Sequence, residues 1–151
     1  MVIGIIAYKS MDDYIFFAWG KDKNGIGRRL DYFERIGYSA TYEDLGSIAK
    51  NVIKYSGENY FIENPDNIGN TCENATGIKI WSKFFKKYFC VSIKLDTISG
   101  FVVSPILKVQ KYRTYMNTKD RYYPVYELPL DCTDEKLGEK IAESFTFAEN
   151  S

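Results

Sequence analysis

Histidine is absent from this 151-residue sequence, and cysteine, proline and tryptophan are scarce. The lack of imidazole excludes Ser-His-Asp and Cys-His catalysis, zinc sites built on histidine, and the commonest general base of enzymes. The three cysteines, Cys72, Cys90 and Cys132, lie far apart and include no Cys-x-x-Cys pair. They predict neither a disulfide framework nor a zinc knuckle. We expect reduced thiols, no metal and no other cofactor.

Long hydrophobic runs are also missing. The apolar run near the amino terminus, residues 2–7, is interrupted by Gly4 and has no basic flank. It is too short for a signal peptide or a membrane span. A cytoplasmic protein without membrane contact is therefore expected.

Enzymes that work with carboxylates, lysine or tyrosine remain possible without histidine, but little in the sequence supports one. The segment GIGRR at residues 25–29 lacks the third glycine and the Lys-Ser/Thr ending of phosphate loops, and it favours a turn that leads into a helix. Asp12 and Asp13 are adjacent in a turn, where neighbouring side chains usually point apart, and a working pair of acids needs a cleft. The expectation is a protein that is not an enzyme.

The residues that are present describe a globular protein, with 45% hydrophobic, 26% charged and 17% aromatic residues. Apolar residues that recur every three or four positions predict helices, and alternation predicts half-buried strands. Helices are expected at residues 26–36, 78–85 and from 41 and 133 onward, and strands at 2–8, 14–19, 89–95, 101–110 and 122–130. Prolines near the ends of the last strand indicate a sheet edge. The prediction is one α+β domain, residues 1–151, with three to four helices packed on a mixed, mainly antiparallel twisted sheet.

Two helix openings are nearly the same, TYEDLG at Thr41 and TDEKLG at Thr133. A threonine in this position can cap a helix, and acids in the first turn favour its positive end. Gly46 and Gly138 lack side chains, so the two helices are expected to approach each other closely on one sheet. An ancient duplication would explain the repeat, and so would convergence on the same demands of capping and burial.

The order of these pieces resembles the immunity proteins of contact-dependent growth inhibition systems. A Trp-containing short helix precedes a VSI-type strand, a returning strand carries a Ser-Pro step, and a capped Leu-Gly helix follows. The matching positions are Trp81, Val91-Ser92-Ile93, Ser104-Pro105, Thr133, Leu137 and Gly138. The resemblance implies an α+β fold, a bacterial cytoplasm, and one-to-one binding of a cognate toxin's carboxyl-terminal domain, often a nuclease, which blocks its activity. The matching residues have the character of scaffold.

The long segment 56–77 contains no Lys or Arg and is predicted to be a loop. A nuclease presents a cationic active site, and an acidic loop with aromatic anchors would complement it. The predicted partner-binding residues are Glu58, Tyr60, Phe61, Glu63, Asp66 and Glu73. In the alternative, Tyr60 and Phe61 form a short strand and the acids only face water.

Charge is unevenly spread, since residues 76–121 hold 10 Lys and Arg against 2 Asp and Glu, and residues 122–151 hold 2 against 7. Within residues 108–123 cations alternate with aromatic rings, a pattern that suits single-stranded nucleic acid. The candidate residues of this alternative surface are Lys111, Tyr112, Arg113, Tyr115, Arg121 and Tyr122. The formal net charge of zero counts against direct nucleic-acid binding, and contact of the same segment with an acidic partner is equally open.

Overall fold

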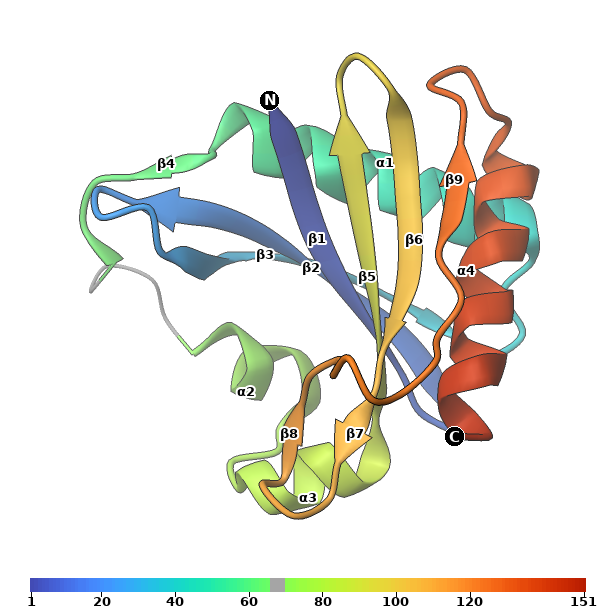
Figure 1. The fold of residues 1–151 in the computed structure, drawn as a ribbon. Helices are drawn as coiled ribbons and strands as arrows, with labels where there is room; N and C mark the ends of the chain where they lie inside the picture. Colours follow the sequence, from blue (N-terminus) through green and yellow to red (C-terminus); the bar gives the residue numbers. More distant parts are fainter. Residues whose placement is uncertain (66–69) are drawn as a thin grey trace.

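The computed structural model describes residues 1–65 and 70–151 (Figure 1). The strands are β1 Val2–Lys9, β2 Asp13–Asp22, β3 Gly27–Gly37, β4 Phe61–Ile62, β5 Phe89–Asp96, β6 Gly100–Ile106, β7 Lys108–Val109, β8 Thr114–Tyr115 and β9 Tyr126–Leu128. The helices are α1 Tyr42–Glu58, α2 Thr71–Thr76, α3 Trp81–Lys87 and α4 Asp134–Glu149.

The main sheet of the described chain is an open seven-stranded sheet with the strand order β3-β2-β1-β5-β6-β9. Neighbours along this order are antiparallel, and the short β4 pairs in parallel with the end of β2. A separate β7–β8 hairpin lies below one end of the sheet (Figure 1). The predicted α+β class with a mixed, mainly antiparallel sheet is confirmed, as is the edge position of the proline-flanked strand β9.

Helices α1 and α4 cover one face of the sheet (Figure 1). Alternate residues of each central strand point to this face, so the strands contribute every second side chain to the main core. Its fully buried members include Ile5 and Ala7 of β1, Phe16 of β2, Val91 and Ile93 of β5, and Leu45, Val52, Leu137, Ile141 and Phe145 of the helices. This apolar stripe on each helix is the one that the sequence periodicity predicted.

The two similar helix openings meet each other. A Cβ atom on Gly46 of α1 would lie 1.8 Å from the carbonyl oxygen of Asp134, in the first turn of α4. Reciprocally, a Cβ atom on Gly138 of α4 would lie 1.7 Å from the carbonyl oxygen of Tyr42, in the first turn of α1. Each Leu-Gly step therefore admits the backbone of the other helix, so the two copies of the motif serve one reciprocal contact.

The caps of both helices are as predicted. The hydroxyl of Thr41 accepts a hydrogen bond from the backbone N–H of Asp44, whose carboxylate accepts one from the N–H of Thr41. Thr133 caps α4 in the same way by accepting from the N–H of Lys136. Such caps satisfy amides that a helix start leaves without partners.

The opposite face of the sheet is covered at one end only, by α2, α3 and the β7–β8 hairpin (Figure 1). This second core is built from aromatic rings: the Tyr8 and Phe84 rings are 5.0 Å apart, and the Phe84 and Tyr88 rings 4.7 Å apart. The indole nitrogen of Trp81 donates to the carbonyl of Arg113 at 2.7 Å and so ties α3 to the hairpin. Trp81 thus has the scaffold role expected of it.

The helix predicted at residues 26–36 is wrong, because this segment forms strand β3. Ile26, Leu30, Phe33 and Ile36 are spaced like a helical stripe, but Leu30 and Ile36 contact the main core, whereas Phe33 contacts the second core on the opposite face. A register shift between Phe17 and Trp19 of the partner strand disturbs strict alternation. The carboxylate of Asp22 closes the β2–β3 turn by accepting from the backbone N–H groups of Asn24 and Ile26.

Four other predicted elements differ in extent. The segment 56–77 is not one loop: α1 continues to Glu58, β4 follows, and α2 fills residues 71–76. The strand expected at 101–110 divides into β6 and β7, which belong to different sheets, and the strand expected at 122–130 shortens to β9. The helix expected at 78–85 begins at Trp81 and ends at Lys87. For the strands, pairing between distant segments decides the boundary, and local periodicity does not contain that information.

Candidate functional site

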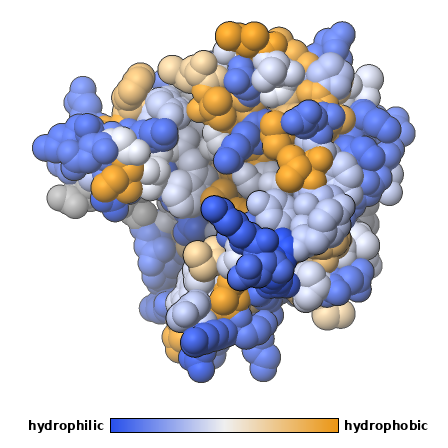
Figure 2. All heavy atoms as spheres, in the orientation of Figure 1, coloured by the Kyte–Doolittle hydropathy of each residue, from blue (hydrophilic) through white to orange (hydrophobic). Residues whose placement is uncertain are grey.

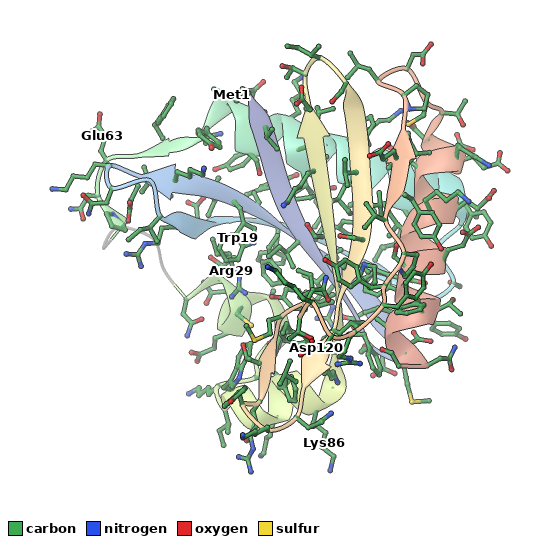
Figure 3. All side chains as sticks on the ribbon, viewed as in Figure 1. Met1, Trp19, Arg29, Glu63, Lys86 and Asp120 are labelled. Atoms are coloured by element: carbon green, nitrogen blue, oxygen red, sulfur yellow. The ribbon has the colours of Figure 1, made fainter. Side chains whose placement is uncertain are left out.

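The predicted partner-binding residues divide into an exposed group and a packed group. Glu58, Phe61 and Glu63 are exposed around the short strand β4, and the Phe61 side chain is 76% exposed. We call these three residues the acidic edge. Hydrophilic residues surround the projecting tip on which Glu63 lies (Figure 2, Figure 3). Phe61 is thus an exposed apolar residue between two exposed carboxylates.

Tyr60 and Glu73 take part in contacts within the fold. The Tyr60 ring packs edge-on against Phe61, with 5.1 Å between centroids, and its carbonyl accepts from the backbone N–H of Lys21 at 2.7 Å. Glu73 lies in the first turn of α2 and pairs with Lys79 at 3.8 Å. Asp66 lies outside the described residues. The alternative prediction was that Tyr60 and Phe61 form a short strand. It is correct for Phe61, which forms β4 with Ile62, whereas Tyr60 lies just before this strand.

The acidic edge is less purely negative in space than in sequence. Strand β4 pairs with the end of β2, which places Lys21 opposite Phe61. The β2–β3 turn that follows contains Lys23. Cations from another segment therefore accompany the acids, a feature that a count along residues 56–77 could not reveal.

The alternative surface of alternating cations and rings is not assembled on one face. Tyr115 points into the second core, where its hydroxyl donates to the carbonyl of Tyr88 at 2.8 Å and its ring packs on Phe85. Tyr122 is exposed but packs against Phe147 of α4. The residues Lys111, Tyr112 and Arg113 are exposed at the tip of the hairpin, whereas Arg121 donates to the carbonyl of Lys108. The structure thus separates the rings that a stacking platform for nucleic acid would need.

Burial changes the pKa values of several ionisable groups in the second core. Burial raises the pKa of the Tyr8 and Tyr115 hydroxyls and of the Cys90 thiol well above their ordinary values. These groups stay neutral at physiological pH and act as packing residues. Because a raised pKa removes thiolate character, Cys90 is not a candidate nucleophile.

The two acids of the enzyme alternative have separate partners. Asp13 is buried and accepts hydrogen bonds from Ser10, Arg35 and Tyr88, whereas Asp12 is exposed and pairs with Lys87 at 3.6 Å. The two carboxylates therefore do not contact a common partner among the described residues. The GIGRR segment forms a hairpin turn and the start of β3 instead of leading into a helix. Among the described residues, no group of three or more Cys, Asp or Glu is placed to hold a metal ion.

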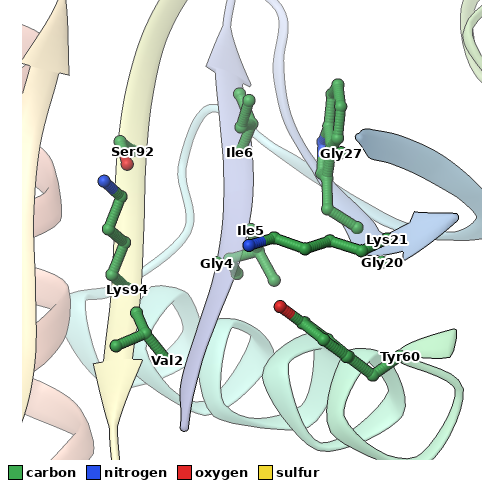
Figure 4. A pocket seen from close by; sticks show the side chains of 11 residues that line it. Val2, Gly4, Ile5, Ile6, Gly20, Lys21, Gly27, Tyr60, Ser92 and Lys94 are labelled. Carbon is green, nitrogen blue, oxygen red and sulfur yellow. The ribbon is translucent and has the colours of Figure 1, made fainter. Parts of the chain in front are cut away.

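Sequence reasoning missed a cleft of about 320 Å³ on the uncovered part of the sheet. Gly4 lies at its floor, with the Lys21, Tyr60, Ser92 and Lys94 side chains around it (Figure 4). The lining comes from strands β1, β2, β3 and β5 together with Tyr60. Only the solvent-facing positions of Ser92 and Lys94 in the alternation of β5 hinted at it in the sequence.

Solved structures share this fold over nearly the whole chain. A protein of unknown function from Neisseria meningitidis, NMB0488, superposes with a TM-score of 0.73 at 14% identity, over 98% of this chain and 96% of that chain. A chain of the CdiA-CT/CdiI toxin and immunity complex from Yersinia pseudotuberculosis gives a TM-score of 0.69 at 11% identity, with 97% of each chain covered. No protein-family model matches the sequence, and no curated protein matches it. The likeness establishes a shared α+β fold with a chain from a toxin and immunity complex.

The longest of the described helices, α1, has 17 residues, and no helix among the described residues is long and apolar enough to cross a membrane. Cys72, Cys90 and Cys132 are all free thiols, as expected.

Proposed function

We propose that this chain is an immunity protein that binds and neutralises a cognate contact-dependent growth inhibition toxin domain. The observation that carries the proposal is the likeness of fold, across 97% of the chain, to a chain of a toxin and immunity complex. The motif resemblance around Trp81, Ser104 and Thr133 adds to it. One-to-one binding in the bacterial cytoplasm occludes the toxin's active site or substrate surface, and this role requires no catalytic group or cofactor.

The acidic edge is the contact surface that we propose for a toxin of the nuclease class. A nuclease active site is cationic because it must bind phosphates, so Glu58 and Glu63 offer complementary potential. Phe61 supplies exposed apolar area between them. Complementary charge steers encounter and selects the partner, while an aromatic anchor contributes most of its free energy once buried.

Calorimetric titration of this protein with the toxin-like domain encoded by the neighbouring upstream reading frame tests the function directly. We expect a one-to-one complex and loss of the toxin's activity at equimolar ratio. Raising the salt concentration should weaken the complex, because screened charges attract less. Absence of a complex, or a complex in which the toxin stays fully active, would contradict the proposal.

Reversing the charge of the acidic edge tests the surface. We expect Glu58→Lys combined with Glu63→Lys to slow association with the toxin domain by about tenfold at low salt, with little change in the dissociation rate. Both side chains are exposed and have no ion pair among the described residues, so the thermal midpoint should remain nearly unchanged. Surface plasmon resonance measures both rates.

A matched control carries the same change of net charge at Glu127 and Asp131, which are exposed near the opposite edge of the sheet. Glu127→Lys with Asp131→Lys should leave the association rate close to that of the natural protein. Equal slowing in both pairs would assign the effect to net charge. A collapse of the thermal midpoint in the edge variant would assign Glu58 and Glu63 to the scaffold instead.

A further inference from the structure

A groove lined by cations lies between α3 and the β7–β8 hairpin. Figure 1 shows these elements at the lower end of the molecule, where Figure 3 labels Lys86. The volume of the groove is about 570 Å³, and its lining consists of Ser82, Lys83, Phe85, Lys86, Lys108, Gln110 and Arg113. We call it the basic groove. Four of these seven residues are cations and none is acidic, so the groove has a potential of a single sign.

The cations of the basic groove have no acidic partner within the described residues. Lys83, Lys86, Lys108 and Arg113 are absent from every ion pair there. Other cations of the same lobe are neutralised, since Lys79 pairs with Glu73 and Lys87 with Asp12. Four cations without an acidic partner in the described chain thus line the groove together.

Lys108 is held in place rather than free in solvent. Its Nζ atom donates to the carbonyl of Lys86 at 3.3 Å and lies 4.2 Å from the Phe89 ring centroid and 5.2 Å from that of Phe85. Burial lowers the pKa of Lys108 below its ordinary value, which reflects a charge that has lost part of its hydration. A carboxylate beside this ammonium would restore the lost stabilisation.

Arg113 is the one residue other than glycine with a positive φ among the described residues, at 48°. This left-handed conformation costs free energy for a residue with a side chain and persists only where surrounding contacts impose it. Two contacts do so here: its carbonyl accepts from the indole of Trp81 at 2.7 Å, and its N–H donates to the carbonyl of Gln110 at 3.3 Å. The turn therefore places a guanidinium at the groove at a cost to stability.

The basic groove continues around the hairpin. A neighbouring depression of about 590 Å³ shares Lys108 and Gln110 with it and adds Lys111 and Arg121. The one acid in that depression, Glu149, is neutralised by Lys9 at 2.6 Å. A continuous cationic path along both sides of the hairpin fits an extended chain better than a single small anion.

We propose that the basic groove binds an extended acidic segment of the partner protein, with carboxylates seated on Lys83, Lys108 and Arg113. The inference rests on the proposed function for the identity of that partner, the toxin domain, and adds a second contact of opposite sign to the acidic edge. Arg113 can hold a carboxylate through two parallel hydrogen bonds, and the lysines act as point charges. A peptide is favoured over nucleic acid because Tyr115 is packed in the core, which leaves no ladder of rings for bases to stack on.

The test uses the whole protein and two labelled probes, an oligoglutamate peptide and an oligouridylate RNA of matched length, followed by fluorescence anisotropy at low and high salt. We expect the peptide to bind more tightly than the RNA. Lys83→Glu with Arg113→Glu should weaken peptide binding by at least about tenfold. The control pair, Lys23→Glu with Lys54→Glu, makes the same change of net charge at exposed sites outside the groove and should keep most of the affinity.

A second variant separates binding from folding. Arg113→Gly removes the guanidinium and also relieves the positive φ, so it should raise the thermal midpoint while it weakens peptide binding. A variant that merely unfolded could not give this combination. Tighter binding of the RNA, equal loss in the control pair, or unchanged peptide affinity in the groove variants would each overturn the inference.

The toxin domain distinguishes this inference from the proposed function. If the toxin binds the natural protein and the groove variant equally well, the groove inference fails and the proposed function stands. If the peptide binds as expected but the toxin does not bind at all, the proposed function fails. The groove then still binds an acidic segment, but one that belongs to a different partner protein.

Discussion

Replacing Gly138 with alanine is expected to lower the free energy of unfolding by about 3 kcal/mol or more. The added Cβ atom would lie 1.7 Å from the carbonyl oxygen of Tyr42 and 2.5 Å from its carbonyl carbon. These atoms belong to the backbone of α1, so no side chain can rotate away to make room. Relief requires α1 and α4 to separate, which would open the main core around Leu45 and Leu137.

The reciprocal contact predicts a specific pattern in a double variant. Gly46→Ala should be destabilising for the same reason, because its Cβ atom would lie 1.8 Å from the carbonyl oxygen of Asp134. Once one substitution has moved the helices apart, the other finds part of the space that it needs. Gly46→Ala with Gly138→Ala should therefore cost less than the sum of the two single changes. Full additivity would contradict a shared contact.

Gly37→Ala is the matched control, and denaturant unfolding followed by circular dichroism is the measurement. A Cβ atom on Gly37 would have no neighbour within 4 Å, and its φ is not positive. Its effect should stay within about 0.5 kcal/mol. If Gly138→Ala unfolds at the same denaturant concentration as this control, the close approach of the helices does not contribute to stability.

The helices at Thr41 and Thr133 could be predicted from the sequence because cap, acidic first turn and apolar period agree there. Strand β3 could not, since its apolar residues divide between two cores that face opposite sides of the sheet. A periodicity argument assumes one buried face. Where a strand is covered on both sides, as β3 is by α1 and α2, the apolar spacing carries contributions from both and can imitate a helix.

The candidate surfaces show the same limit at the level of side chains. The exposure of Phe61 and Glu63 agrees with their predicted place on the surface. The sequence left contact of the segment 108–123 with an acidic partner open, but it did not predict the basic groove, because the groove joins α3 to a hairpin more than twenty residues later. The φ of Arg113 and the inward packing of Tyr115 follow from tertiary contacts with Trp81 and Tyr88, which a run of alternating cations and rings does not specify.

Asp13→Asn is expected to lower the free energy of unfolding by about 2 to 4 kcal/mol. The Asp13 carboxylate is buried and accepts from the Ser10 hydroxyl at 2.5 Å, the Arg35 guanidinium at 2.5 Å and the Tyr88 hydroxyl at 3.4 Å. An amide nitrogen in place of one carboxylate oxygen replaces an acceptor by a donor, which then faces these donors without forming a hydrogen bond to them. Arg35 also donates to the carbonyl of Ala75, so the loss extends from the β1–β2 turn to α2.

Asp12→Asn is the control for this substitution, because the Asp12 side chain is exposed and pairs with Lys87 at the surface. Its effect on stability should stay below about 1 kcal/mol. Thermal and denaturant unfolding of both variants, together with toxin neutralisation by the fraction that remains folded, separate a structural acid from a functional one.

A folded Asp13→Asn protein should still neutralise toxin, since Asp13 is shielded from any partner by its three donors. Retained stability with lost neutralisation would instead make Asp13 part of the working site, and the enzyme alternative would then have its first support.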